Sequence, residues 1–383
     1  MHKSLNTYVI KVLVVTLTIS ILTGCSMSKE YNYIYTNKEI LSPFWKSEVM
    51  YNESVLMIKD GDSLPSGTLL FPAKKIISVR DSSLRKEYVQ GEDYTYSDGV
   101  ITLIDGAKVP YLTTRQLLGE GVPTNVVCMS SSKTETNRVL FTETPYIVEK
   151  QLAVTYVHDQ SSNDIEFSEY SEELLPISIA QLKAKEKMKI LVYGDSIATG
   201  CNSSKVLGVE PFTPTWPELV KIGLEEHYGA TIALTNSAVG GTISDWGARN
   251  VSSLAAPHKP DLAIIAFGMN DGTGKVPAED YKLNIKSIMD SIKEENPATE
   301  FVLISPIMAN PDSDYAGTQD QYISVLKELE NTGVAVVNMT EVHKEFLKTK
   351  HYTSMTGNNI NHLNDFIARV YAMNILSLLV EYK

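Results

Sequence analysis

Short apolar runs alternate with longer helical stretches in the second half of the chain, and this alternation limits the choice of fold more than any other feature. The apolar runs have the length of strands and are Ile190–Tyr193, Thr231–Leu234, Leu262–Phe267, Phe301–Ile304 and Val334–Val337. The stretches with helical patterning are Pro217–Tyr228, Thr242–Leu254, Pro277–Glu295, Gln319–Asn331, Thr340–Lys348 and Asn364–Tyr382. Such alternation predicts a mostly parallel sheet covered by helices on both faces, which is a three-layer α/β/α domain.

Residues 45–180 have a different pattern, which is typical of an all-β fold. Short runs rich in β-branched and aromatic residues are separated by turn residues such as Asp60-Gly61-Asp62 and Ser97-Asp98-Gly99. The runs are Ser54–Ile58, Thr68–Phe71, Ile76–Val79, Tyr94–Tyr96, Val100–Leu103, Asn125–Met129, Val139–Thr142 and Leu152–Val157. We therefore predict a β-sandwich or jelly-roll-like accessory domain over 45–180 and an α/β domain over 186–383. The pattern leaves two roles open for the front domain, packing or carbohydrate binding.

The first 24 residues are typical of an export signal and not of folded structure. Lys3 and Lys11 precede an apolar run, 12–22, that is too short to span a membrane. The run ends in Leu22-Thr23-Gly24-Cys25, which resembles the bacterial lipobox. That resemblance implies cleavage before Cys25, lipidation of this cysteine and anchoring of the exported protein to the membrane at the cell surface. Residues 25–44 are then predicted to be a polar tether.

Charge and cysteine content exclude some functions. The chain carries 34 basic and 46 acidic residues and no basic stripe, so nucleic-acid binding is not expected, because phosphate backbones repel such a surface. Two cysteines remain besides Cys25, namely Cys128 and Cys201. We favour two buried free thiols over a disulfide between them, and no CxxC metal motif is present.

Three polar segments follow three successive predicted strands. They are Gly194-Asp195-Ser196, the run from Asn236 to Gly240-Gly241-Thr242, and Gly268-Met269-Asn270-Asp271. Because the carboxyl ends of parallel strands meet at one edge of the sheet, we expect these segments to converge. A serine at this edge becomes a nucleophile when a neighbouring base takes its proton. Backbone N–H groups of the glycine pair, together with an asparagine amide, can form an oxyanion hole.

Together with a late histidine, these segments resemble the SGNH/GDSL hydrolase family over about residues 188–383. The sequences GDSIATG, NSAVGG and GMND match the first three blocks of that family. The resemblance implies a flavodoxin-like sheet and ester hydrolysis without a metal or cofactor. It also implies Ser196 as the nucleophile, and Ser196, Gly241 and Asn270 as oxyanion-hole donors, with Gly240 as the alternative to Gly241. Asp195 is implied to be structural.

The fourth block departs from the pattern of the family. His362 stands at the start of the last predicted helix, where the family has its base, and His351 is the rival candidate. The position three residues before this histidine is usually aspartate and is here Asn359. We therefore expect either that Asn359 orients the imidazole through its side-chain oxygen or that a backbone carbonyl does so in a Ser–His dyad. Asp365 is expected to cap backbone donors at a helix start.

The resemblance further implies a substrate class. An exported, tethered esterase with a β-rich front domain is similar to bacterial carbohydrate esterases that remove acetyl groups from polysaccharides. Trp216 and Trp246 follow the first two blocks and are candidates to stack on sugar rings, although core packing is the commoner fate of tryptophan. The alternatives are a lysophospholipase or thioesterase, a peptidoglycan O-acetylesterase, and a non-catalytic carbohydrate-binding surface lipoprotein.

Overall fold

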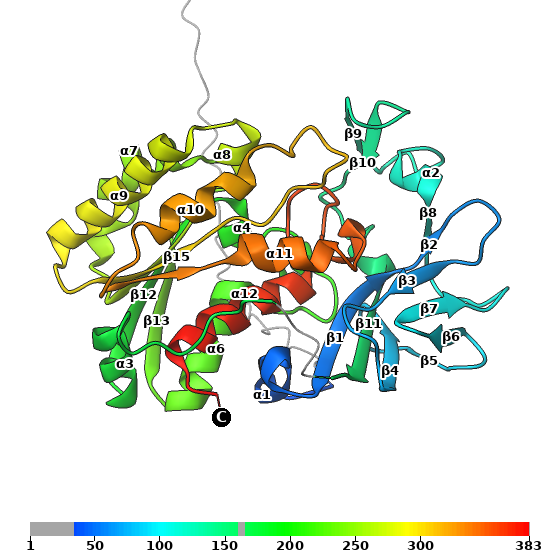
Figure 1. Cartoon of the computed structure of the whole chain (residues 1–383), viewed down its shortest axis with the longest axis horizontal. Helices are drawn as coiled ribbons and strands as arrows, with labels where there is room; N and C mark the ends of the chain where they lie inside the picture. Colours follow the sequence, from blue (N-terminus) through cyan, green and yellow to red (C-terminus); the bar gives the residue numbers. More distant parts are fainter. Residues whose placement is uncertain (1–33, 160–164, 383) are drawn as a thin grey trace, which may run out of the picture. The chain divides into compact units, whose positions relative to one another are not determined.

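A five-stranded parallel sheet forms the centre of the second half of the chain (Figure 1). The computed structural model describes residues 34–159 and 165–382. The strand order is β13-β12-β14-β15-β16, and all neighbouring strands run parallel. The strands are β12 (Lys187–Gly194), β13 (Thr231–Asn236), β14 (Leu262–Ala266), β15 (Glu300–Ile304) and β16 (Val334–Val337). The predicted parallel α/β fold is confirmed.

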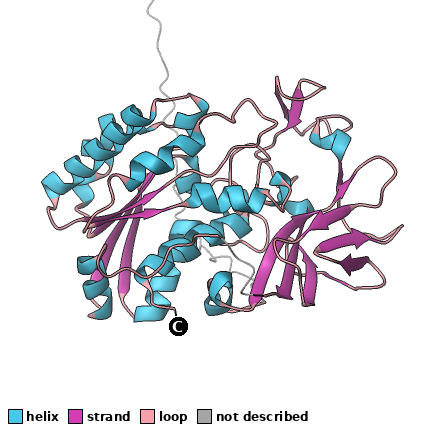
Figure 2. Cartoon of the chain, in the orientation of Figure 1, coloured by secondary structure: helices cyan, strands magenta, loops and turns pink. Residues whose placement is uncertain are grey.

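Helices cover both faces of this sheet (Figure 2). Alternate residues of β12 show how the two faces divide, because Ile190 and Val192 belong to one core cluster and Leu191 and Tyr193 to another. The first cluster contains side chains of α6 (Trp216–Tyr228), α11 (Met339–Leu347) and α12 (Asp365–Leu379). The second contains side chains of α7 (Ser244–Leu254), α9 (Ala278–Glu295) and α10 (Tyr322–Lys327). In the described part of the chain, no helix combines the length and the apolar character that a membrane span requires.

The order of the strands places a topological switch point at the end of β12. The chain leaves β12 for β13 on one side and then crosses back to β14 on the other side. Open α/β sheets bind ligands at such a switch point. Gly194 ends β12, and a Cβ at this position would lie 2.2 Å from the carbonyl oxygen of Ala266. Only glycine therefore lets the end of β12 approach β14 this closely.

The first half of the chain is β-rich and mostly antiparallel, as predicted. One sheet has the order β1-β11-β4-β5, a second has the order β6-β7-β3-β2-β8, and β9 and β10 form a hairpin. The strands of the first sheet are β1 (Val49–Leu56), β4 (Lys75–Asp81), β5 (Glu87–Tyr88) and β11 (Gln151–Val157). Those of the second are β2 (Ile58–Lys59), β3 (Ser66–Thr68), β6 (Tyr94–Ser97), β7 (Val100–Leu103) and β8 (Leu112–Thr113). The hairpin strands are β9 (Cys128–Ser130) and β10 (Arg138–Leu140).

The end of the predicted tether is folded. Thr36 caps a short helix, α1 (Asn37–Ile40), through a capping box with Glu39. Ile40, Leu41 and Phe44 are buried in the main core cluster. The prediction of a tether up to residue 44 is therefore wrong for its last part, because these apolar side chains gain more by packing than by staying in solvent. The predicted signal segment, Cys25 and the rest of the tether lie outside the described residues.

The β-rich region and the α/β domain belong to one compact unit. Glu53 of β1 and Lys350, in the segment after α11, form an ion pair in which both side chains are fully buried. Arg369 of α12 donates to the backbone oxygens of Tyr51 and Asn52, each at 2.7 Å. These contacts fix the β-rich region against the segments before and after His362. The boundary predicted between residues 180 and 186 stays a prediction.

Candidate active site

Ser196 lies just past the carboxyl end of β12, as the first residue of the short helix α4 (Ser196–Thr199). The residue before it, Asp195, caps this helix by accepting a hydrogen bond from the backbone N–H of Ile197 at 2.9 Å. Burial is the main cause that raises the pKa of Asp195 to about 7. Its contact is with the turn that carries the serine, as expected of a structural residue.

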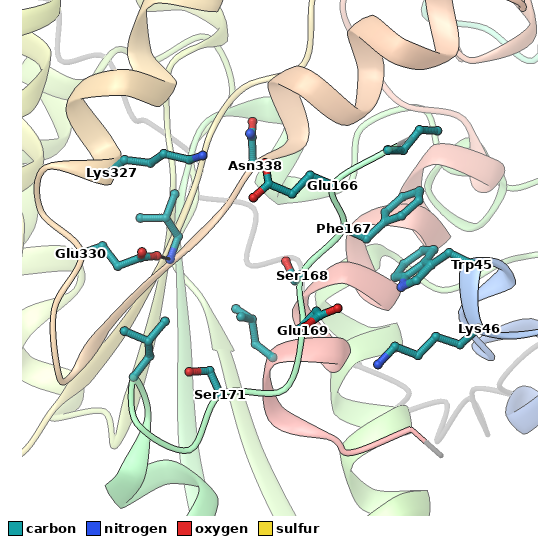
Figure 3. A pocket seen from close by; sticks show the side chains of 14 residues that line it. Trp45, Lys46, Glu166, Phe167, Ser168, Glu169, Ser171, Lys327, Glu330 and Asn338 are labelled. Carbon is teal, nitrogen blue, oxygen red and sulfur yellow. Dashed lines mark hydrogen bonds between the residues drawn. The ribbon is translucent and has the colours of Figure 1, made fainter. Parts of the chain in front are cut away.

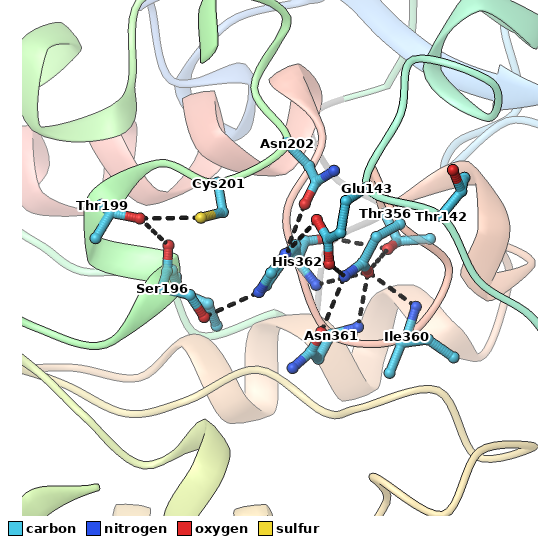
Figure 4. A network of polar contacts seen from close by, with 12 residues as sticks. Thr142, Glu143, Ser196, Thr199, Cys201, Asn202, Thr356, Ile360, Asn361 and His362 are labelled. Carbon is cyan, nitrogen blue, oxygen red and sulfur yellow. Dashed lines mark hydrogen bonds and ion pairs between the residues drawn. The ribbon is translucent and has the colours of Figure 1, made fainter. Parts of the chain in front are cut away.

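The imidazole of His362 stands between Ser196 and Asn202 (Figure 4). Its Nε2 is 2.9 Å from the Ser196 hydroxyl oxygen, and its Nδ1 is 2.6 Å from the side-chain oxygen of Asn202. An amide oxygen only accepts hydrogen bonds, so Nδ1 carries the ring hydrogen and Nε2 is left to accept from the serine. This is the tautomer that a general base requires.

The loop that carries His362 is held by its own polar side chains. The side-chain oxygen of Asn358 accepts from the backbone N–H groups of Ile360, Asn361 and His362 at 2.9–3.0 Å. The hydroxyl of Thr356 donates to the backbone oxygen of His362 at 2.8 Å. Asparagine and threonine satisfy backbone groups in this way where no regular structure does, so the position of the imidazole is fixed locally.

The glycine-containing segment passes beside Ser196, and the asparagine-containing segment contacts the glycine-containing one. A Cβ at Gly240 would lie 3.6 Å from the Cβ of Ser196, so the glycine loop passes beside the serine. The next residue, Gly241, has a φ of +77°, which favours glycine. Asn270, in α8 (Met269–Thr273), donates from Nδ2 to the backbone oxygen of Thr242 at 2.9 Å. Nδ2 of Asn270 carries two hydrogens, so one is left after the hydrogen bond to Thr242. The three predicted segments therefore converge, and the oxyanion roles of Ser196, Gly241 and Asn270 stay predictions.

Asn359 does not contact the imidazole, so the prediction that it orients His362 is wrong. Its side-chain Nδ2 donates to the backbone oxygen of Leu140 at 2.9 Å, and its own oxygens accept from Asn310. Its φ is +69°, in the left-handed region that asparagine adopts more readily than most residues. Asn202 occupies the orienting place instead. It comes six residues after the serine, in the continuation of the first block, a position that the family pattern does not mark.

A carboxylate from the β-rich region lies beside the same ring. Oε2 of Glu143, in the segment after β10, is 3.4 Å from Nδ1 of His362. Its Oε1 accepts from Nδ2 of Asn358 at 3.2 Å. Burial raises the pKa of Glu143, but the hydrogen bond and charge of His362 and the amides of Asn358 and Asn202 outweigh burial and lower it overall. No sequence motif marks Glu143.

The remaining candidates lie elsewhere. Trp216 is fully buried and donates to the backbone oxygen of Ile197 at 2.9 Å, so it supports α4 and is not available to a sugar. Trp246 is partly buried against the core on the other face of the sheet. His351 contacts Thr353 of its own turn at 2.7 Å. Asp365 accepts from the backbone N–H of Ser204 at 2.8 Å, whereas Asn364 caps α12.

The two cysteines are free, as we favoured, although both are partly exposed. Within 34–159 and 165–382, no group of three or more His, Cys, Asp or Glu side chains is placed to hold a metal ion.

A cavity of about 590 Å³ lies apart from these residues (Figure 3). Trp45 and Phe167, whose rings stack 3.8 Å apart, line it together with charged side chains that include Glu166 and Lys327. Neither Ser196 nor His362 is among its lining residues. The candidate active site is therefore defined by its side-chain geometry and not by this cavity.

Comparison with known proteins gives a family match in the α/β domain and one curated relative. Residues 192–369 match the family described as GDSL-like lipase/acylhydrolase. An arylesterase of Vibrio mimicus is 30% identical over 106 residues, which are 28% of this chain and 49% of the arylesterase. The chain thus spans about half the length of that relative.

Two solved structures are also similar. A two-domain esterase active on acetylated mannans is 20% identical, with a TM-score of 0.46 over 55% of this chain and 53% of that chain. A catalytic mutant of an acetylxylan esterase from Geobacillus stearothermophilus is 18% identical, with a TM-score of 0.40 over 51% of this chain and 95% of that chain.

Proposed function

The α/β part of this chain, residues 192–369, belongs to the GDSL-like lipase/acylhydrolase family, and we propose that the protein is an esterase that removes short acyl groups, above all O-acetyl groups, from carbohydrates. The observation that carries the proposal is the 2.9 Å contact between the Ser196 hydroxyl and Nε2 of His362 at the switch point of the sheet. A serine hydroxyl is a weak nucleophile until a base in hydrogen-bond reach takes its proton.

The proposed chemistry is acyl transfer through the serine. Nε2 of His362 takes the hydroxyl proton while Oγ of Ser196 attacks the ester carbonyl carbon. The resulting imidazolium donates from Nδ1 to Asn202 and gives its Nε2 proton to the alcohol as the alcohol leaves. Water then attacks the acyl-enzyme by the same route and releases the acid. The backbone N–H groups of Ser196 and Gly241 and the amide of Asn270 are the proposed donors to the oxyanion.

The surroundings of His362 support a polar substrate. Glu143 lies beside the ring with its side chain about half exposed, whereas Asn202, Asn358 and Asn361 are buried. An exposed carboxylate can accept hydrogen bonds from the hydroxyls of a sugar, whereas a long acyl chain gains affinity from apolar surface. This carboxylate therefore favours short acyl esters of carbohydrates over lipid esters.

Acetate release from a panel of acetylated glycans tests the proposed function. We expect the wild type to release acetate and Ser196→Ala to lose at least about a thousandfold in kcat, because the nucleophile of a triad-type enzyme is nearly indispensable. Rates on p-nitrophenyl esters should fall steeply beyond short acyl chains. A preference for long chains would instead favour the lysophospholipase or thioesterase alternative.

Labelling of Ser196 with a fluorophosphonate separates an esterase from the non-catalytic alternative. The reagent reacts with an activated serine, so we expect a covalent adduct on the wild type and none on Ser196→Ala. An unlabelled wild type without esterase activity would reject the proposal and favour a carbohydrate-binding surface protein.

We further propose that the protein is exported and lipid-anchored at Cys25. The apolar run at 12–22 and the lipobox-like Leu22-Thr23-Gly24-Cys25 support this. Metabolic labelling with a fatty-acid analogue should mark the wild type and not Cys25→Ser. Equal labelling of both would contradict lipidation at this residue.

A further inference from the structure

The proposed reaction places a positive charge on His362, and the usual carboxylate for that charge is missing from the α/β domain. Position 359, three residues before the histidine, is asparagine and its side chain contacts Leu140 and Asn310. The partner of Nδ1 at 2.6 Å is Asn202, which is a neutral amide. A neutral oxygen orients the ring, but it stabilises an imidazolium less than a carboxylate does.

Glu143 supplies negative charge at this point. Its Oε2 is 3.4 Å from Nδ1 of His362, which is too long for a strong hydrogen bond but close for an ion pair. The side chain is about half exposed, at 51%, so solvent screens part of the interaction. Because the pKa of Glu143 is lowered, the carboxylate stays ionised to a lower pH than an ordinary glutamate.

The position of Glu143 is set by the structure on both sides of it. Asn358 donates to its Oε1 at 3.2 Å. The hydroxyl of the preceding Thr142 contacts that of Thr144 at 2.7 Å and accepts from the Thr144 backbone N–H at 3.0 Å. Among the described residues, Cys201 is a further titratable group near Glu143, and its pKa is raised by burial and, to a smaller extent, by this carboxylate.

The segment 140–143 is fastened to the loop of the histidine. The side chain of Asn359 donates to the backbone oxygen of Leu140 at 2.9 Å. The backbone N–H of Thr142 donates to the backbone oxygen of Asn358 at 3.4 Å. The position that carries the acid in the usual fourth block therefore holds the segment that brings Glu143 to the ring.

We infer that Glu143 is the charge partner of His362 and Asn202 its orienting partner, so that one active site is built from both regions of the chain. Glu143 is then a positioning residue that acts through the imidazole. This inference rests on the proposed function, because the carboxylate matters only if His362 becomes charged during the reaction.

Variants of the full chain test the inference on p-nitrophenyl acetate. Glu143→Gln keeps the shape of the side chain and removes its charge. We expect kcat to fall about threefold to tenfold with KM unchanged, as for a partly screened ion pair. The acidic limb of kcat/KM against pH should move to lower pH, since the imidazolium loses a stabilising charge. The matched control is Glu149→Gln, an exposed glutamate of the same region, which should behave as the wild type.

A double variant that moves the carboxylate and a series of salt concentrations distinguish an electrostatic role of Glu143 from a purely structural one. Asn202→Asp combined with Glu143→Gln moves the carboxylate to the orienting position. We expect this double variant to have a higher kcat than Glu143→Gln alone and an acidic limb that returns towards its wild-type pH. Added NaCl should lower the rate of the wild type towards that of Glu143→Gln and change the variant less, because salt screens a half-exposed charge. A merely structural role for Glu143 predicts neither result.

Two results would overturn the inference. One is a Glu143→Gln enzyme whose kcat and acidic limb equal those of the wild type while Ser196→Ala is inactive. The other is an equal loss in Glu149→Gln. Activity that survives Ser196→Ala would instead overturn the proposed function. The pH dependence of fluorophosphonate labelling provides the same comparison of Glu143→Gln with the wild type without an ester substrate.

Discussion

The left-handed backbone at Asn202 explains why an asparagine can stand beside the imidazole there. Its φ is +64°, a conformation that asparagine and glycine adopt more readily than other residues. Gly357, in the loop that carries His362 (the histidine loop), packs directly against Asn202. A Cβ at Gly357 would lie 2.5 Å from the Cβ of Asn202. The two residues together let the first block and the histidine loop meet, and Asn202 then fixes which nitrogen of His362 is protonated.

Removal of the Asn202 side chain should therefore lower the rate without disturbing the backbone. Asn202→Gly keeps the left-handed conformation accessible. We expect kcat/KM on p-nitrophenyl acetate to fall about tenfold to a hundredfold, which is the effect of losing one hydrogen bond to a group that becomes charged. The thermal midpoint is the control for folding. Wild-type kinetics in a folded Asn202→Gly enzyme would show that the amide does not orient the base.

At the scale of elements, the inner strands of the α/β domain could be predicted because they are buried on both faces. β12, β14 and β15 contain continuous apolar runs, and the polar segments of the candidate site follow β12, β13 and β14. Two strands of the β-rich region, β5 and β8, were missed, since two residues are too few to form a pattern. The helix expected over 319–331 is shorter, with a 3₁₀ turn before α10 and an end at Lys327.

The residues of the candidate site also divide into those that a local sequence motif predicts and those that no motif predicts. The contact between Ser196 and His362 was predictable because each residue stands in a local motif at the end of a strand or near the start of a helix, whereas the oxyanion roles of Gly241 and Asn270 stay predictions. Glu143 was not predictable, because only the docking of the β-rich region on the histidine loop brings its carboxylate to the ring. No periodicity or spacing in a single sequence records such a contact between distant segments.

The contact between Asn359 and the segment after β10 gives a prediction at this scale. Asn359→Gly keeps the positive φ but removes the hydrogen bond to Leu140. We expect a loss of kcat no larger than that of Glu143→Gln, and little further loss when the two changes are combined, because both act through the same carboxylate. A double-mutant cycle on kcat measures this. Losses that multiply would mean that Asn359 acts independently of Glu143.

At the scale of the whole molecule, the β-rich region is held to the α/β domain by buried polar contacts. The carboxylate of Glu53 pairs with Lys350 and also accepts from the Leu70 backbone N–H at 2.9 Å and from the Tyr156 hydroxyl at 2.5 Å. The ammonium of Lys350 donates in addition to the backbone oxygen of Thr68 at 3.3 Å. The lysine comes from the segment before the histidine loop and its partners from the β-rich region, so we expect both regions to unfold together.

Lys350→Met should therefore destabilise the entire chain. The substitution leaves the buried carboxylate of Glu53 without its counter-charge, which costs about 3–5 kcal/mol in comparable sites. Urea unfolding followed by tryptophan fluorescence and by far-UV circular dichroism measures the loss and shows whether one transition remains.

The matched control is Lys286→Met, which removes an exposed ion pair with Asp290 on α9 and should cost less than about 1 kcal/mol. Glu53→Gln combined with Lys350→Met should cost less than the sum of the single changes, because no unpaired charge is left in the core. Two separate transitions in the wild type, or equal losses in the two lysine variants, would contradict a single cooperative unit held by this pair.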